Sequence, residues 1–165
     1  MKKHILATIF ILLIFVLSAC GPNPIAIGEK APDFTLRNLD GKEVSLKDSN
    51  GKAVLINFWG AWCPPCTIEM PDIVDRSITY SDELVVMAVN YGDSLKTVRD
   101  FTNQMSLSFS PLLDLAGDVV DLYLVSGYPT SIFIDSEGVI QMIHVGYMDA
   151  EQLDQYLGMI NVGGR

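Results

Sequence analysis

The sequence predicts an α/β domain of three layers, in which a central mixed sheet lies between helices. Apolar strand-like runs alternate with helical segments along most of the chain, which is typical of parallel strands joined by crossover helices. The last two strand-like runs are separated only by Ser136-Glu137-Gly138, a loop of hairpin length that adds an antiparallel pair. The 165 residues suffice for one domain, and no internal repeat or second domain is visible.

The strands are predicted from short runs of apolar or alternating residues. The first two form a β-hairpin, because Asp40-Gly41 lies between them and this dipeptide is a strong turn signal. The third and fourth are continuously apolar, as expected of strands buried on both faces. The expected strands cover residues 34–37, 43–46, 52–59, 83–90, 130–135 and 139–145.

Four helices are expected, two of them with a clear N-terminal cap. Ser94 and Asp149 are residue types that accept hydrogen bonds from the first free backbone N–H groups of a helix. Pro64 and Pro65 are tolerated in the first turn of the first helix, where no intrahelical donor is needed. The apolar residues of that helix roughly keep one face: Ile68, Met70, Ile73, Val74 and Ile78. The expected helices cover residues 64–80, 95–105, 115–125 and 150–159.

Composition excludes several classes of protein. Hydrophobic residues make up 49% and charged residues 19% of the chain, so a normal core can form. Three cysteines and two histidines exclude a disulfide scaffold and a zinc module built from several CxxC pairs. The 20 acidic and 11 basic residues give a net charge of −9, which repels phosphate and makes nucleic acid a poor partner.

The N-terminus is typical of an export signal. A short basic start precedes an apolar run over residues 5–17, which is too short to span a bilayer but has the length of a signal-peptide core. Leu17-Ser18-Ala19-Cys20 resembles the lipobox of bacterial lipoproteins, in which the cysteine sulfur carries the lipid and becomes the first mature residue. An ordinary secretory signal and an uncleaved anchor are the alternatives, and all three export the domain.

This interpretation divides the chain into four segments. Loss of the signal peptide removes Lys2 and Lys3 and no acid, which leaves a mature net charge of −11. Pro22 and Pro24 with no periodicity around them indicate a tether between lipid and domain. The expected segments are a signal peptide over 1–19, a tether over 20–30, a folded domain over 31–160 and a tail over 161–165.

The remaining two cysteines form a CxxC motif, Cys63-Pro64-Pro65-Cys66, at a strand-to-helix junction. Free N–H groups and the helix dipole at that junction favour a thiolate on Cys63. We therefore expect Cys63 to be the exposed attacking thiol and Cys66, one turn inside, to be the resolving thiol. Half of a zinc site is the alternative, but it needs two more ligands, and His144 is the only histidine of the mature chain.

These residues resemble the TlpA/ResA-like branch of the thioredoxin superfamily. The resemblance covers roughly residues 25–160, and its motifs are Ala31-Pro32-Asp33-Phe34, Asn57-Phe58-Trp59, Trp62-Cys63-Pro64-Pro65-Cys66 and Glu69-Met70-Pro71. It implies a thioredoxin-like fold with an N-terminal β-hairpin and a thiol–disulfide oxidoreductase without a cofactor or metal. It also implies a lipid-anchored protein on the extracytoplasmic face of the bacterial cell membrane.

The resemblance further implies partners and a direction. The partners would be disulfides or dithiols of exported proteins, together with a membrane thiol carrier that keeps the dithiol reduced. The implied direction is reduction, with the haem-binding CxxCH of cytochrome c maturation as one substrate by analogy.

The resemblance assigns further site residues. Gly127-Tyr128-Pro129-Thr130 resembles the cis-proline loop that faces the CxxC, whereas the sequence alone shows only a proline before a strand, where it does little harm. Substrate would contact Trp62, Pro64, Pro65, Tyr128 and Pro129, with the backbone of Tyr128 pairing with an extended segment. Trp62 is either a lid beside Cys63 or a packing residue.

Glu69 is the expected proton-transfer group. Thioredoxins proper have a buried acid six residues before the first cysteine, and here that residue is Asn57. Glu69 matches the acid of the TlpA/ResA-like branch, and it lies one helical turn beyond Cys66. A carboxylate there raises thiol pKa values and can relay a proton. A solvated surface acid is the alternative.

Two other functions remain as alternatives. A peroxiredoxin-type peroxidase shares the Ala-Pro-Asp-Phe start, but it has a threonine or serine three residues before the reactive cysteine, where this chain has Gly60. A Cu(I)-binding chaperone could use the two thiolates and His144, since Cu(I) favours soft sulfur ligands. The related copper proteins, however, have three residues between their cysteines and this chain has two.

Overall fold

A computed structural model of the chain describes residues 25–49 and 51–164. The predicted signal peptide and the predicted lipidation site, Cys20, lie outside these residues. The strands are β1 (Thr35–Asn38), β2 (Glu43–Ser45), β3 (Ala53–Trp59), β4 (Leu84–Asn90), β5 (Leu112–Leu113), β6 (Thr130–Ile134) and β7 (Ile140–Val145). The helices are α2 (Pro64–Thr79), α3 (Leu95–Met105), α4 (Asp118–Leu122) and α5 (Ala150–Met159), with a 3-10 turn, η2 (Leu46–Ser49), after β2.

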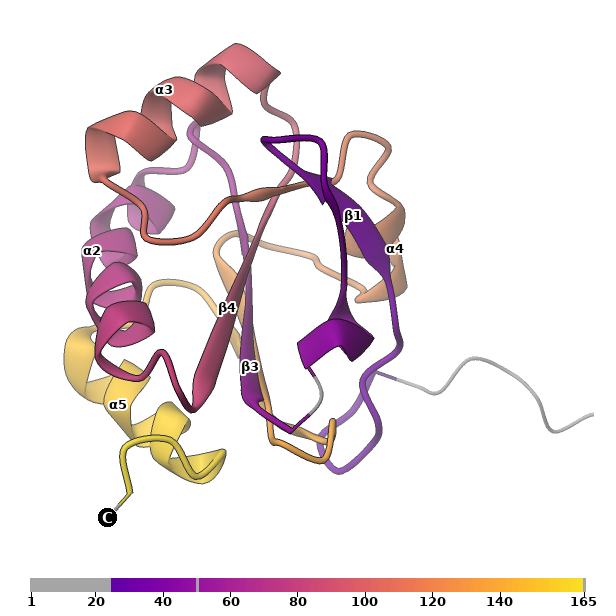
Figure 1. Cartoon of the computed structure of the whole chain (residues 1–165), viewed down its shortest axis with the longest axis vertical. Helices are drawn as coiled ribbons and strands as arrows, with labels where there is room; N and C mark the ends of the chain where they lie inside the picture. Colours follow the sequence, from indigo (N-terminus) through magenta and orange to yellow (C-terminus); the bar gives the residue numbers. More distant parts are fainter. Residues whose placement is uncertain (1–24, 50, 165) are drawn as a thin grey trace, which may run out of the picture.

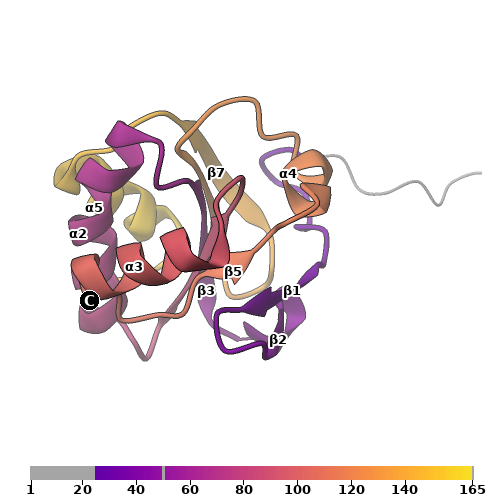
Figure 2. The same cartoon turned by 90° about the horizontal axis from the view of Figure 1, so that it is seen from above.

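The strands form one mixed sheet in the order β2-β1-β5-β4-β3-β6-β7. The central strand β3 runs parallel to β4 and antiparallel to β6, and β7 completes the closing hairpin. Helices α2, α3 and α5 lie on one side of the sheet and α4 on the other (Figures 1 and 2). The predicted three-layer α/β fold with its N-terminal hairpin is confirmed.

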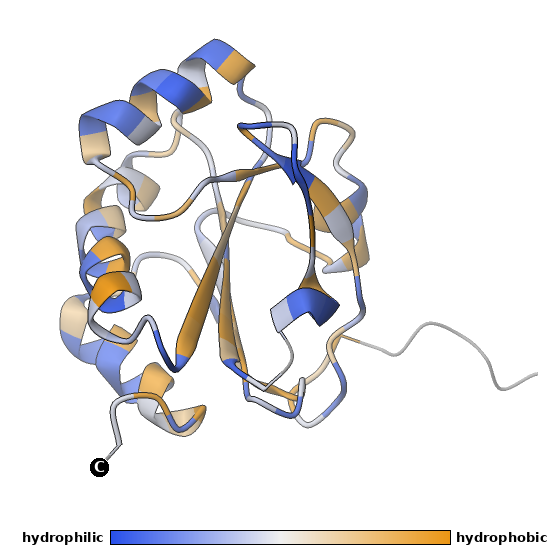
Figure 3. Ribbon diagram, viewed as in Figure 1, coloured by the Kyte–Doolittle hydropathy of each residue, from blue (hydrophilic) through white to orange (hydrophobic). Residues whose placement is uncertain are grey.

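Strand β3 fixes the centre of the molecule because every one of its residues is buried. Val54, Ile56 and Phe58 pack in one core cluster with residues of α4, and Leu55 packs in a second cluster with residues of α5. Figure 3 shows this central strand as almost wholly hydrophobic. The alternation of a strand therefore places Asn57 and Trp59 on the face that α2 covers.

The region after α3 differs from the prediction. A helix was expected over residues 115–125, but the helix spans only Asp118–Leu122, and the short strand β5 precedes it. A two-residue strand is too short to produce a recognisable alternation. The helix starts late because Gly117 takes a left-handed conformation, and the buried Asp114 carboxylate accepts hydrogen bonds from the backbone N–H groups of Val119 and Val120.

The two predicted caps are present. The Ser94 hydroxyl accepts a hydrogen bond from the N–H of Thr97, and Asp149 forms a capping box with Gln152.

The folded part also includes residues outside the predicted 31–160 span. The N–H of Gly28 donates to the carbonyl of Ile140, and Val162 is buried against α5. Among the described residues, no helix is long and apolar enough to cross a bilayer.

Candidate active site

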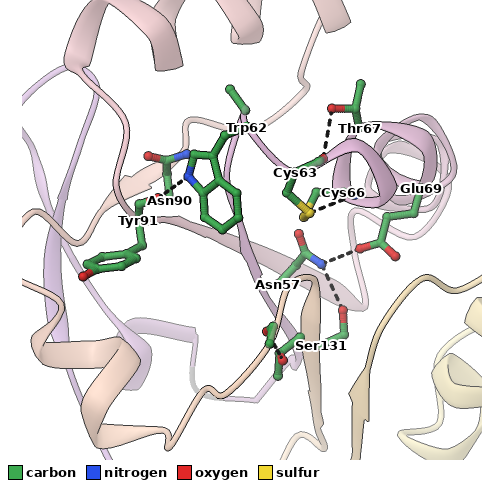
Figure 4. Close-up of a disulfide and its surroundings, with 12 residues drawn as sticks. Asn57, Trp62, Cys63, Cys66, Thr67, Glu69, Asn90, Tyr91 and Ser131 are labelled. Carbon is green, nitrogen blue, oxygen red and sulfur yellow. Dashed lines mark hydrogen bonds between the residues drawn. A yellow bond between two sulfur atoms is a disulfide. The ribbon is translucent and has the colours of Figure 1, made fainter.

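Cys63 and Cys66 form a disulfide where β3 gives way to α2 (Figure 4). The two sulfurs are 2.06 Å apart, and the Cα atoms are 5.3 Å apart. Cys63 is the N-cap residue of α2, and its Sγ accepts a hydrogen bond from the backbone N–H of Cys66 at 3.3 Å. In the reduced protein this N–H and the helix dipole stabilise a thiolate on Cys63.

The expectation that Cys63 is exposed is wrong for this disulfide form. Cys63 has a relative exposure of only 3%, and Cys66 of 0%. Both pack in a cluster with Trp59 and Met70, and the half-buried Tyr128 lies against that cluster. Of the pair, Cys63 retains the greater contact with solvent, which is the order that the helix geometry predicts.

An aromatic row borders the disulfide on its solvent side. Trp62 is 53% exposed and lies beside the disulfide, and its Nε1 donates to the carbonyl of Tyr91 at 3.2 Å (Figure 4). The Trp62 ring meets Tyr128 edge-on at 5.1 Å, and Tyr128 stacks parallel to Tyr91 at 6.4 Å. A single indole thus flanks the disulfide and still faces solvent, as a lid would.

Gly60 is needed for this position of the indole. A Cβ atom at residue 60 would lie 2.4 Å from Nε1 of Trp62, a distance that such atoms do not adopt. A threonine or serine at this position would therefore displace Trp62. The activating hydroxyl of a peroxiredoxin is absent here, and the room that it would occupy is already taken by Trp62.

The Tyr128–Pro129 peptide bond is cis, as the resemblance implied. It directly precedes β6, and Tyr128 reaches the cysteine cluster from this loop. Pro64 and Pro65 are the first two residues of α2, next to Cys63. Trp62, Pro64 and Pro65 therefore lie next to the disulfide (Figure 4), and Tyr128 packs against its cluster from the loop that contains Pro129.

Glu69 is not a surface acid. It is 1% exposed on the inner face of α2, where its Oε1 accepts from Asn57 Nδ2 at 2.9 Å and its Oε2 accepts from the N–H of Met148 at 3.1 Å. Burial raises the pKa of Glu69 from 4.5 to about 7, although both hydrogen bonds favour the ionised form and oppose the increase. The side chain can therefore gain or lose a proton near neutral pH.

Asn57 is fully buried between the disulfide and Glu69, in the place of the acid that thioredoxins proper carry. Its Nδ2 also donates to the hydroxyl of Ser131 at 3.0 Å, and Ser131 faces Asn57 directly across the β3–β6 pair. Sequence analysis missed Ser131, because only the strand register brings together residues 74 positions apart.

The described residues contain no group of three or more His, Cys, Asp and Glu side chains arranged to hold a metal ion. His144 lies within hydrogen-bonding distance of the Tyr147 carbonyl and the Tyr156 hydroxyl. It therefore has hydrogen-bonding partners in the segment after β7 and on α5, as expected of a structural histidine.

Comparison with known proteins agrees with this geometry. The sequence matches the AhpC/TSA family over residues 27–143. It is 44% identical to the thioredoxin-like protein YneN of Bacillus subtilis, over 80% of this chain and 79% of that protein. It is 36% identical to the thiol-disulfide oxidoreductase ResA of Bacillus thuringiensis subsp. konkukian, over 97% of this chain and 99% of ResA.

Solved structures share the fold. A Chlorobium tepidum protein described as a thiol:disulfide interchange protein DsbE superposes with a TM-score of 0.76 at 33% identity, covering 83% of this chain and 99% of the other. The pneumococcal exposed lipoprotein thioredoxin Etrx1 of Streptococcus pneumoniae superposes with a TM-score of 0.66 at 32% identity, covering 77% and 98%. The expected thioredoxin-like fold is therefore confirmed.

Proposed function

Because this chain belongs to the AhpC/TSA family and is a thiol–disulfide oxidoreductase of the TlpA/ResA-like type, we propose that Cys63 and Cys66 exchange disulfides with exported proteins and that Glu69 handles the proton. One observation carries this proposal. The disulfide lies at the N-terminus of α2, and a buried carboxylate lies one turn further along the same helix.

The proposed reaction begins with the reduced protein. The Cys63 thiolate attacks one sulfur of a substrate disulfide and forms a mixed disulfide, and the other substrate sulfur leaves as a thiolate. Cys66 then loses its proton and attacks the Cys63 sulfur. The Cys63–Cys66 disulfide forms, the second substrate sulfur leaves, and the substrate has gained two electrons. Two protons complete the substrate dithiol.

Glu69 suits the proton transfer in this second step. A base works best when its pKa lies near the working pH, and burial brings the pKa of Glu69 to about 7. An ordinary exposed glutamate would be too weak a base to take a proton from Cys66. Glu69 lies three residues after Cys66 on the same helix, which puts the two side chains on one face.

The substrate segment is proposed to bind over Trp62 and against the cis-proline loop. The exposed indole and the ring of Tyr128 offer apolar area next to the disulfide. The loop backbone at Tyr128 precedes β6 and is proposed to pair with an extended segment, as in strand addition. Backbone pairing of this kind tolerates many sequences, which suits an enzyme that acts on more than one exported protein.

We also propose where the protein works. The Leu17-Ser18-Ala19-Cys20 motif supports lipidation of Cys20 and attachment to the extracytoplasmic face of the cell membrane. Mass spectrometry of the mature N-terminus should find a diacylglyceryl thioether on Cys20. A soluble product with a free Cys20 thiol would contradict this proposal.

The direction that we propose is reduction, with electrons from a membrane thiol carrier and with haem-binding CxxCH disulfides among the substrates. The resemblance to the TlpA/ResA-like branch supports this direction. A peptide with an oxidised CxxCH should be reduced stoichiometrically by the reduced protein. If that disulfide survives while other protein disulfides are reduced, cytochrome c maturation is not the role.

Trapping in cells tests the exchange reaction. Cys66→Ala cannot resolve mixed disulfides, so partners should remain attached to Cys63 and separate from it on reduction. Cys63→Ala is the matched control and should trap far less. Equal trapping by both variants, or a peroxide-reducing activity without exchange, would overturn the proposal.

A further inference from the structure

The described residues contain three buried side-chain N or O atoms without a hydrogen-bond partner, and one of them, on Asn57, lies beside the disulfide (Figure 4). They are Asn57 Oδ1, Trp59 Nε1 and the Tyr128 hydroxyl. Trp59 and Tyr128 pack in the cluster that holds both cysteines. Buried polar atoms are nearly always paired, so the unpaired oxygen of Asn57 points to a partner that the oxidised protein does not supply.

The orientation of Asn57 determines where its oxygen points. Its Nδ2 donates to Glu69 Oε1 and to the hydroxyl of Ser131. An ionised carboxylate can only accept, so the amide nitrogen must face Glu69 and the oxygen must face the other way. Figure 4 shows that oxygen on the side of the disulfide.

We propose that Asn57 Oδ1 accepts a hydrogen bond from the Cys66 thiol when the disulfide is reduced. Neither sulfur of the disulfide carries a hydrogen, so the oxygen has no donor in the oxidised form. Reduction by an external dithiol breaks the Sγ–Sγ bond, transfers two electrons and two protons to the cysteines, and leaves the external dithiol as a disulfide. Cys66 and Asn57 are both fully buried, so bulk solvent does not reach the new S–H.

Asn57 is then a positioning residue, and its oxygen has a hydrogen-bond donor only in the reduced form. Through Nδ2 it stabilises the ionised form of Glu69, and through Oδ1 it stabilises the protonated form of Cys66. The reduced enzyme would hold a neutral Cys66 next to a charged acid until the mixed disulfide forms. This inference rests on the proposed roles of Cys66 and Glu69. It assigns Asn57 as the residue that stabilises the protonated thiol of Cys66 and the ionised carboxylate of Glu69.

The S–H stretching vibration tests this hydrogen bond directly, because an acceptor lowers its frequency. The Cys66 band is obtained by subtracting the infrared spectrum of reduced Cys63→Ser/Cys66→Ser from that of reduced Cys63→Ser. We expect a lowered frequency with Asn57 present and a return to the frequency of an unbonded thiol in Asn57→Leu. Ser131→Ala is the matched control, because it removes a partner of Nδ2 and leaves the oxygen in place. The S–H band of this variant should stay at the lowered frequency.

The dithiol–disulfide equilibrium gives a second measurement. A net hydrogen bond present only in the reduced form predicts that Asn57→Leu shifts this equilibrium toward the disulfide by roughly threefold to tenfold. The shift should be smaller in a Glu69→Gln background, because a glutamine amide no longer forces the Asn57 nitrogen to face residue 69.

An unbonded Cys66 frequency in the protein with Asn57 present would overturn the inference, and this result does not require that the leucine variant fold. An unchanged equilibrium in a folded Asn57→Leu would do the same. Neither result would affect the proposed exchange reaction, which the trapping experiment measures separately.

Discussion

The buried carboxylate of Glu69 predicts that the oxidised protein loses stability as the pH rises toward neutral. The pKa of Glu69 in the folded protein is about 7, against 4.5 for an ordinary glutamate, so the folded state binds a proton that the unfolded state has already released. The stabilising effect of the protonated form is complete below about pH 4.5 and is lost as the pH rises through 7. Glu69→Gln removes this dependence.

The difference between the two pKa values sets the magnitude. A raised pKa of about 7 against 4.5 corresponds to about 3 kcal/mol at alkaline pH, when one pKa unit is taken as about 1.4 kcal/mol. Glutamine removes the charge, but its NH2 group cannot accept from Asn57 Nδ2 or the N–H of Met148 as a carboxyl oxygen does, which lowers the stability of the variant by the same amount at every pH. The stability of the variant relative to the wild type should therefore increase by roughly 2.5 kcal/mol between pH 5 and pH 8.5.

Denaturant unfolding of the oxidised protein between pH 5 and pH 8.5 measures this difference. The range stays above the titration of Asp135 and Asp154, whose pKa values are lowered and whose contributions have the opposite sign. Glu137→Gln is the matched control, because Glu137 is an exposed glutamate in the loop between β6 and β7. Its stability curve should stay parallel to that of the wild type. A parallel curve for Glu69→Gln as well would refute the claim that Glu69 is desolvated.

Three further predictions concern the reduced protein and the fold. Iodoacetamide at neutral pH should alkylate Cys63 faster than Cys66, because the helix N-terminus favours its thiolate; equal or reversed labelling would exchange the two roles. Glu69→Gln should lower the Cys63 pKa in a thiolate absorbance titration and slow exchange, because a negative charge near the dithiol is lost; superimposable curves and unchanged rates would leave the proton relay unassigned. Asp149→Ala should destabilise the protein by about 1 kcal/mol in denaturant unfolding through loss of the capping box, with an unchanged midpoint as the contrary result.

Local signals allowed most of the fold to be predicted from the sequence. Asp40-Gly41 predicted the first hairpin and Ser94 the start of α3, since each feature depends on residues a few positions apart. The register of β6 against β3, by contrast, depends on the whole sheet. That register brings Ser131 to Asn57, and the folding of the chain brings the N–H of Met148 to Glu69. These contacts could not be read from neighbouring residues.

The orientation of α2 does not follow from the hydrophobicity of its residues alone. Ile68 and Ile78 are 63% and 61% exposed, although the sequence pattern grouped them on one face with Met70 and Ile73. The buried residues of the helix are Cys66, Glu69, Met70 and Ile73, which follow the i, i+3, i+4, i+7 spacing of one helical face. That regular spacing appears only when the glutamate is counted as a core residue. A charged residue on the core face breaks the usual pattern one turn beyond the reactive sulfurs, which is where such exceptions are expected when they serve chemistry.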